Sequence, residues 1–335
     1  MLSSSDSNPD KLVSMTTQDQ STPRNNVHAT LMGHSTDHLL CGELVVDPDL
    51  VREILGLATN ATIPLVAEHA LLQRWGHDLV VVPFSHGWGA PQQPDLDDGF
   101  FRLEHWQQES DLFVFALIDG PFSALAKAWT WQDAIMRLTK GDPEIEVVMA
   151  DTVVDTGELM EAVKEAGADG VIIGDDIAYR RGPYVRPEVL RRHYFPYLTL
   201  LTLAGQDLDL PMVFHSDGNL WPVWDDLVNT GVNGVQCLDS YSAMSMALAR
   251  ERSNPDLCLW GNLDLGWLYQ PRDEQNMRSH LHDLLDPLVG TPTILGTSGG
   301  LAPGIPMTHL DALYKIVRDF PWSDSERTEI PTSGL

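Results

Sequence analysis

Residues 211–219 read PMVFHSDGN, an apolar run that leads directly into a histidine, a serine, an aspartate and a glycine. The run predicts a short buried strand. Because side chains alternate between the two faces of a strand, His215 and Asp217 are predicted to point to the same side. An imidazole and a carboxylate that share a pocket suit metal binding or proton transfer. This segment therefore predicts a strand with functional groups at its carboxyl end.

Seven further apolar runs have the length of strands, and helix-like segments follow most of them. The eight runs lie at residues 39–46, 79–83, 112–118, 171–175, 212–215, 234–238, 257–261 and 292–296. Residues 156–166, 187–203 and 222–229 are predicted helices, the first capped by Thr156 and the other two with a proline in the first turn. Alternating strands and helices predict a parallel sheet. Eight such units predict a single-domain (β/α)8 TIM barrel.

Polar side chains follow every predicted strand at the point where the strand ends. In chain order they are Glu43, His86 with Trp88, Asp119, Asp175 with Asp176, His215 with Asp217, Asp239, Asn262 with Asp264, and Thr297 with Ser298. In a (β/α)8 barrel the carboxyl ends of the strands meet on one face, where the loops form the active site. These separate groups are therefore predicted to line one pocket.

Several polar residues also have ordinary structural explanations. Asp119 precedes a Gly-Pro pair typical of turns, and Asp264 is placed to cap the next helix. Cys237, like Cys258, lies in an apolar strand and is predicted to be a small buried hydrophobe. Asp175 and Asp176 are adjacent and face opposite sides, so one of them is predicted to face the pocket.

The composition of the chain excludes some classes of partner and indicates where the folded domain begins and ends. The 335 residues carry a net charge of −27, which repels nucleic acids and anionic lipid surfaces, so neither is a predicted partner. The apolar runs are much shorter than the roughly 20 residues of a membrane span, which predicts a soluble protein.

Three cysteines form no paired framework, and we expect a cytoplasmic location. Polar residues 1–28 predict a disordered tail, followed by the barrel at 29–325 and a C-terminal tail at 326–335.

Motifs of common enzyme classes are missing from the sequence. There is no phosphate-binding Walker loop, no Rossmann glycine pattern, no HExxH and no CxxC. A Ser–His–Asp hydrolase is disfavoured, because Ser85 and Ser298 lack the context of a nucleophile elbow.

Five motifs in a fixed order nevertheless suggest a family. They are GADGVIIGDD at 167–176, VFHSDGN at 213–219, GVNGVQCLDS at 231–240, LWGNLD at 259–264 and GTSGGLAPGIPMTHLDALYKIV at 296–317. Together they resemble the uroporphyrinogen decarboxylase superfamily, which also contains cobalamin-linked methyltransferases. The resemblance implies a (β/α)8 barrel with a cleft at the carboxyl ends of its strands. It leaves decarboxylation and methyl transfer open.

The porphyrinogen decarboxylases of this superfamily hold a polycarboxylate substrate with arginines near the first strand and an aspartate after the second. Here residues 39–47, LLCGELVVD, contain Glu43 and no arginine, and His86 stands where the aspartate is expected. Carboxylates in the pocket would repel a porphyrinogen by several kcal/mol as an order of magnitude. Porphyrinogen decarboxylation is therefore disfavoured, while decarboxylation of a smaller acid, with His215 as the proton donor, stays open.

The methyltransferases of the superfamily bind zinc through a His-x-Cys pair after the fifth strand and a cysteine after the eighth. This chain keeps His215 but has Asp217 in place of the first cysteine and Ser298 near the place of the second. Zinc accepts nitrogen and oxygen ligands, so His215 and Asp217, completed by Glu43, His86 or Asp239, remain able to hold zinc or another divalent metal. Oxygen ligands favour a more Lewis-acidic metal and an oxygen-bearing substrate.

The resemblance and the residues together predict a small-molecule methyltransferase or demethylase that works with a corrinoid carried by a partner protein. The predicted catalytic residues are His215, Asp217, Asp176 and His86. The predicted substrate contacts are Glu43, Trp88, Asp175, Trp221, Asp239, Asn262 and Ser298, although ordinary packing also explains the two tryptophans. In a metal-free version, His215 is the general acid or base and Asp217 orients it. A non-catalytic corrinoid-docking protein is a further alternative, and the resemblance admits a homodimer.

Overall fold

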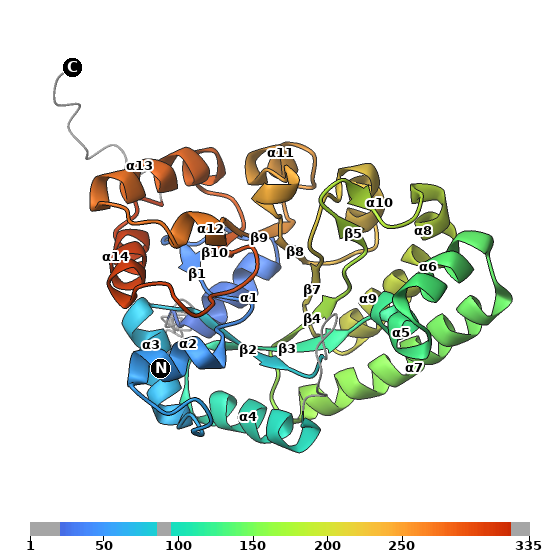
Figure 1. Cartoon of the computed structure of the whole chain (residues 1–335), viewed down its shortest axis with the longest axis horizontal. Helices are drawn as coiled ribbons and strands as arrows, with labels where there is room; N and C mark the ends of the chain where they lie inside the picture. Colours follow the sequence, from blue (N-terminus) through green and yellow to red (C-terminus); the bar gives the residue numbers. More distant parts are fainter. Residues whose placement is uncertain (1–20, 86–94, 323–335) are drawn as a thin grey trace, which may run out of the picture.

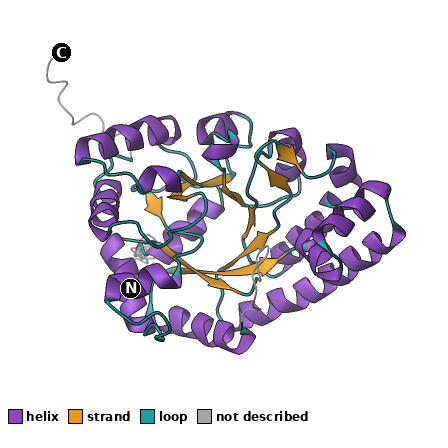
Figure 2. Ribbon diagram, viewed as in Figure 1, coloured by secondary structure: helices purple, strands orange, loops and turns teal. Residues whose placement is uncertain are grey.

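The computed structural model describes residues 21–85 and 95–322. Eight parallel strands curve into a barrel, and helices lie around it (Figures 1 and 2). In their order around the barrel the strands are β1 (Leu40–Cys41), β10 (Thr293–Thr297), β9 (Cys258–Leu263), β8 (Gly234–Cys237), β7 (Met212–His215), β4 (Gly170–Gly174), β3 (Phe113–Asp119) and β2 (Leu79–Pro83). This arrangement confirms the predicted (β/α)8 barrel.

The ring of strands is nearly closed, with a narrow seam between β1 and β2. Asp78 N donates to Cys41 O over 2.8 Å, and the Asp78 carboxylate accepts from Cys41 N over 2.8 Å. Gly42 N still donates to Leu295 O of β10 over 3.0 Å, but the Gly42 carbonyl accepts from the indole of Trp260 over 2.9 Å, and the ladder of β1 ends here. Strand β1 is therefore shorter than the predicted 39–46, and Glu43 lies beyond its end.

Helices follow most of the strands along the chain. In chain order they are α1 (Pro23–Leu31), α2 (Pro48–Leu55), α3 (Leu65–Trp75), α4 (Leu96–Glu109), α5 (Pro121–Ala128), α6 (Trp131–Lys140), α7 (Pro143–Glu165), α8 (Pro187–His193), α9 (Phe195–Asp207), η2 (Trp221–Val223), α10 (Trp224–Val228), η3 (Ser240–Ser242), α11 (Met246–Glu251), α12 (Leu265–Leu268), α13 (Glu274–Leu285), η4 (Asp286–Leu288) and α14 (Met307–Arg318). A separate hairpin pairs β5 (Ala178–Tyr179) with β6 (Gly182–Pro183). Among residues 21–85 and 95–322, no helix has both the length and the apolar character needed to cross a membrane.

All three predicted helices differ from the structure at their boundaries. The predicted helix at 222–229 is a 3-10 turn, η2, followed by the short helix α10. Helix α7 begins at Pro143, where the Asp142 carboxylate caps Glu144 N, so Thr156 lies in the middle of the helix rather than at its start. The predicted helix at 187–203 is divided at Tyr194. Pro196 explains the division, because proline cannot continue a helix but fits the first turn of a new one.

Helix α1 covers the amino-terminal end of the barrel. Its Val27 and Leu31 are buried in the same cluster as Leu40 and Ile294, which point into the barrel from β1 and β10. Residues 23–28 are thus helical, although they fall within the predicted disordered tail at 1–28. With this end filled, the carboxyl ends of the strands are the side on which a site can form.

Candidate functional site

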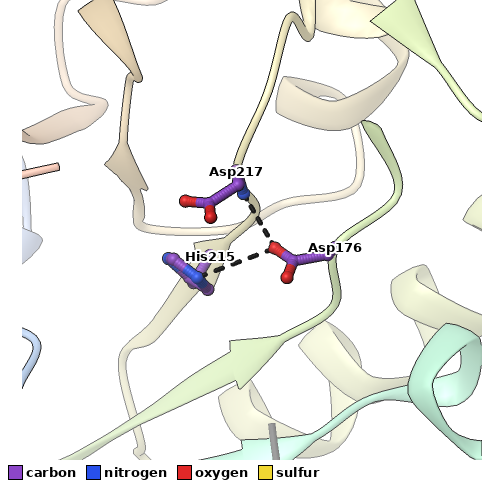
Figure 3. A group of neighbouring side chains, drawn as sticks. All are labelled: Asp176, His215 and Asp217. Atoms are coloured by element: carbon purple, nitrogen blue, oxygen red, sulfur yellow. Dashed lines mark hydrogen bonds and ion pairs between the residues drawn. The ribbon is translucent and has the colours of Figure 1, made fainter. Parts of the chain in front are cut away.

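Asp176, His215 and Asp217 come together at the carboxyl ends of β4 and β7 (Figure 3). One potential ligand atom from each residue lies within 4.8 Å of the other two. His215 ends strand β7, and Gly174, which ends strand β4, lies opposite it in the parallel ladder. His215 points into the barrel because it follows the interior residue Val213 by two positions. Strand register therefore gathers these three predicted residues.

Hydrogen bonding and burial hold the three groups in place. Asp217 N donates to Asp176 Oδ1 over 2.8 Å, and His215 Nε2 lies 3.8 Å from the same oxygen. The side chains of His215 and Asp176 are 14% and 23% exposed, and Asp217 is exposed. Burial raises the pKa of Asp176, and the electrostatic interaction with His215 and the hydrogen bond from Asp217 N oppose this rise only in part. A cation between the groups would relieve this unfavourable burial of charge.

Gln236 holds the opposite side of the imidazole. It lies beside His215 in the ladder between β7 and β8 and is fully buried. Its Oε1 accepts a hydrogen bond from His215 Nδ1, and its Nε2 donates to the carbonyls of Thr297 and Ser298 at 3.4 Å. Because an amide oxygen only accepts, Nδ1 carries the proton and Nε2 keeps its lone pair in the neutral ring. We did not predict Gln236, although an amide inside an apolar strand was a usable signal.

Cys237 also contacts the cluster. Its sulfur donates to Asp217 Oδ1 over 3.1 Å. Cys237 is buried, as predicted, but it is not a simple hydrophobe. Burial, followed by the carboxylate of Asp217, raises the pKa of the thiol well above its ordinary value. The free thiol is therefore protonated at neutral pH.

Glu43 lies at the seam between β1 and β2. One carboxylate oxygen accepts from Thr297 N over 2.9 Å and from the Thr297 hydroxyl, and the other accepts from Tyr314 OH over 2.7 Å. Burial raises the pKa of Glu43 from 4.5 to about 7, against the opposing effect of these hydrogen bonds. Thr297 thereby links Glu43 to the cluster around His215, because its backbone carbonyl accepts a hydrogen bond from Gln236, and Gln236 accepts from His215.

A cavity of about 510 Å³ adjoins Glu43. Its wall is largely apolar and includes Leu44, Val46, Leu79 and Val81. This volume is in the range of small-molecule pockets. The lining also carries charged groups, among them Glu68 and Arg102, which form an ion pair of 2.9 Å, and of the carboxylates that line the cavity Glu43 is the buried one. The described residues that line the cavity do not include Asp176, His215 or Asp217.

Asp175 points away from this end of the barrel, opposite to Asp176. It is fully buried, and its carboxylate accepts from Phe122 N over 3.0 Å, from Ser123 N over 2.7 Å and from Tyr194 OH over 2.9 Å. These contacts anchor the start of α5 and the turn before α9. No surface of Asp175 is left for a substrate, so we leave it out of the proposed site.

Three other carboxylates after the strands serve local structure. Asp239 caps η3 by accepting from Tyr241 N over 2.9 Å, and Asp264 caps α12 by accepting from Trp267 N over 2.8 Å. Asp119 lies 2.6 Å from Lys127 Nζ. The contact of Asp239 with a substrate stays a prediction.

The other predicted substrate contacts are spread along the rim. Trp221 donates from its indole to Ala243 O over 3.0 Å. Asn262 is buried, and its Oδ1 has no hydrogen-bond partner among the described residues. Ser298 supports the cluster only through its carbonyl, which accepts from Gln236. His86 and Trp88 lie outside the described residues.

Comparisons with known proteins agree with this architecture. The family model for uroporphyrinogen decarboxylase (URO-D) matches residues 103–320, more than half of the chain. None of the curated proteins matches. A methyltransferase from Methanosarcina mazei has a similar structure, with 17% identity, a TM-score of 0.72, and coverage of 89% of this chain and 99% of that one. A protein described as a vitamin-B12-independent methionine synthase from Listeria monocytogenes has 15% identity, a TM-score of 0.50, and coverage of 84% and 95%.

These structural likenesses show the fold alone, because the identities are low. The family match is the stronger finding, since it spans the chain from α4 to the end of α14 and includes the strands that carry Asp176 and His215. The chain belongs to the uroporphyrinogen decarboxylase family.

Proposed function

We propose that this chain transfers a methyl group to or from a small, oxygen-bearing molecule, using a divalent metal at Asp176, His215 and Asp217. A corrinoid on a partner protein would carry the methyl group. The observation that carries the proposal is the set of three ligand atoms within 4.8 Å. One imidazole nitrogen and two carboxylate oxygens suit zinc or a related divalent ion. Family membership supports the proposal, because the sequence resemblance includes cobalamin-linked methyltransferases.

The spacing of the ligand atoms fits a single ion. Two nitrogen or oxygen ligand atoms on one tetrahedral zinc lie about 3.3 to 3.6 Å apart, given bonds of roughly 2.0 to 2.2 Å. His215 Nε2 and Asp176 Oδ1 lie 3.8 Å apart, so a small side-chain movement is sufficient. When bound, the metal would supply Lewis-acid polarisation of a substrate oxygen.

The chain's own residues prepare this chemistry. Gln236 keeps the proton on Nδ1 of His215, which leaves Nε2 available as a ligand. The backbone N–H of Asp217 fixes the Asp176 carboxylate. Burial, and then Asp176 and Asp217, raise the pKa of Tyr184. Tyr184 therefore keeps its proton at neutral pH and can donate a hydrogen bond to a substrate oxygen.

Metal content and corrinoid demethylation test the proposal. After supplementation with Zn(II) or Co(II), the purified protein is expected to retain about one equivalent of metal, measured by mass spectrometry. It is also expected to demethylate a methylated corrinoid in the presence of a thiol or phenol acceptor, which the cobalt absorbance reports. His215→Ala should lose both properties. His282→Ala changes a histidine on α13 that is 44% exposed, and it should retain both.

Two outcomes would contradict the proposal. Retention of less than about a tenth of an equivalent after supplementation removes the metal site. An unchanged demethylation rate in His215→Ala removes this residue from catalysis. Binding of the corrinoid without turnover would instead support the docking alternative.

Glu43 favours a second candidate, the decarboxylation of a small non-porphyrin acid. The carboxyl group lies against the cavity, and burial raises its pKa to about 7, so the protonated form is well populated near neutral pH. Such a group can protonate the carbanion that forms when carbon dioxide leaves. Release of carbon dioxide from small carboxylic acids without a corrinoid, lost in Glu43→Gln, would support this candidate over methyl transfer.

A further inference from the structure

We infer that the cavity beside Glu43 is a second small-molecule site, which binds an uncharged, largely apolar ligand with one hydrogen-bonding group. The described lining of this cavity is separate from Asp176, His215 and Asp217, so the inference does not depend on the proposed metal. It also differs from the decarboxylation candidate, because the ligand of that candidate would be an acid.

The cavity passes through the wall of the barrel at the seam between β1 and β2. Strand β2 continues to Pro83, whereas β1 ends at Cys41, and no strand of the described chain is paired with this edge of β2. Leu79 lines the cavity from the interior of the barrel, and Val51 of α2 and Leu72 of α3 line it from the layer of helices. A ligand at the seam would therefore be enclosed from both sides, as in typical small-molecule sites.

Two buried polar side chains, Glu43 and His77, supply hydrogen-bonding groups to this apolar cavity. Both contact Tyr314. Its hydroxyl donates to Glu43 over 2.7 Å, and its ring makes a T-shaped contact with the His77 imidazole, with ring centroids 4.8 Å apart. His77 is 4% exposed, and its Nε2 has no hydrogen-bond partner among the described residues. A buried nitrogen without a partner is unfavourable, and a ligand that reaches the imidazole would satisfy it.

The charges around the cavity favour an uncharged ligand. Burial lowers the pKa of His77 from 6.5 to about 3, so the imidazole is neutral at neutral pH. The two guanidinium groups of the described lining are already paired, Arg52 with Asp49 at 2.7 Å and Arg102 with Glu68 at 2.9 Å. An anionic ligand would find no free cationic partner among these lining residues. A cationic ligand would lose its hydration against the apolar wall.

Binding of N-phenyl-1-naphthylamine, an uncharged fluorescent molecule, tests the location of the site. The native chain is expected to bind about one equivalent with an increase in fluorescence. Val81→Trp places an indole in the cavity and should weaken binding at least about tenfold. Val66→Trp is the matched control, because it adds the same side chain at a position of α3 that is 73% exposed, and it should bind the probe as the native chain does.

Displacement of the probe at about pH 7.5 tests the class of ligand. 1-Naphthol, 1-naphthoate and 1-naphthylmethylammonium share one ring system and differ in charge. The uncharged 1-naphthol should displace the probe at concentrations at least about tenfold lower than either ion. The native chain should also prefer 1-naphthol to naphthalene, and His77→Phe should abolish this preference, because the partner of the hydroxyl is then removed.

The outcomes that would overturn the inference are distinct. Absence of probe binding, or equal binding in Val81→Trp and the native chain, would show that the cavity is not the site. If Val81→Trp does not fold, Ile63→Trp fills the cavity from the loop before α3 and replaces it in this comparison. Stronger displacement by either ion would exclude an uncharged ligand, and stronger displacement by 1-naphthoate would support the decarboxylation candidate instead.

The role of His77 and the proposed metal site are tested separately from the location of the cavity. A preference for 1-naphthol over naphthalene that survives in His77→Phe would remove His77 from the site. His215→Ala should bind the probe as the native chain does, so a failure of the metal proposal would leave this result unchanged. Loss of probe binding in His215→Ala would overturn the separation of the two sites.

Discussion

At the scale of single residues, Gln236 determines which nitrogen of His215 carries the proton. Gln236→Leu removes the acceptor for Nδ1 with little change in size, so the proton can move to Nε2. We expect Zn(II) affinity to fall about 10- to 100-fold, as for other residues that orient metal ligands. NMR of the imidazole nitrogens, assigned by comparison with His215→Ala, should show the Nδ1–H tautomer in the native chain and a mixture in the variant.

A rescue variant separates this role from simple packing. In its protonated form, the side chain introduced by Gln236→Glu offers an acceptor and a donor, so this variant should retain the Nδ1–H tautomer. If Gln236→Leu kept the same tautomer and Zn(II) affinity as the native chain, the orienting role of Gln236 would be excluded.

Strand alternation explains how much of the site was predictable. It placed His215 and Asp217 on one side and required that either Asp175 or Asp176 face the pocket. It could not decide between these two, because the choice depends on the buried N–H groups at the start of α5 that Asp175 satisfies. It also could not place Cys237, because the positive φ angles at the end of β8 interrupt the alternation.

At the scale of elements, Asp175 connects β4 to α5 and to the turn before α9. Asp175→Ala leaves the Phe122 and Ser123 N–H groups and the Tyr194 hydroxyl without their buried acceptor. We expect the free energy of unfolding to fall by about 3 kcal/mol or more, measured by urea denaturation at neutral pH. Asp176→Ala is the matched control, because the neighbouring carboxylate faces the candidate site. It should change stability little and weaken Zn(II) binding; the opposite pattern would contradict both assignments.

Strand boundaries were predicted more accurately from the sequence than helix boundaries. Strands β2 and β7 match the predicted ranges 79–83 and 212–215, because polar or turn-forming residues bound these short apolar runs on both sides. The start of α7 was missed because Thr156 provides a plausible cap within a longer helix. The break between α8 and α9 was missed because the helix-forming residues on both sides of Pro196 suggest one continuous helix.

At the scale of the whole molecule, the net charge of −27 affects what the site can bind. A strongly negative protein attracts cations toward its carboxylates and repels polyanions. We expect Zn(II) affinity, measured by isothermal titration calorimetry, to fall when sodium chloride is raised from about 20 mM to about 500 mM, because salt screens this field. An affinity that is independent of salt would mean that only the local ligands determine binding.

Buried carboxyl groups also make the stability of the barrel depend on pH. Burial raises the pKa of Glu43 from 4.5 to about 7 in the folded chain. A group that holds its proton more tightly when folded stabilises the fold fully below its unfolded pKa, and this contribution is lost as the pH rises through the folded pKa. For Glu43 the loss is about 3 kcal/mol between about pH 4.5 and pH 7.

Urea denaturation at about pH 5 and about pH 7.5 measures this contribution. Other carboxylates, including Asp175 with its pKa of about 6, add their own pH dependence, so the informative quantity is the difference between the native chain and Glu43→Gln. Between these two pH values the native chain should lose about 2 kcal/mol more stability than Glu43→Gln, because the amide does not titrate and still offers an acceptor to Thr297. Glu53→Gln, which changes an exposed carboxylate on α2, should leave the pH dependence unchanged. The same pH dependence in Glu43→Gln and the native chain would show that Glu43 does not bind its proton more tightly in the folded barrel.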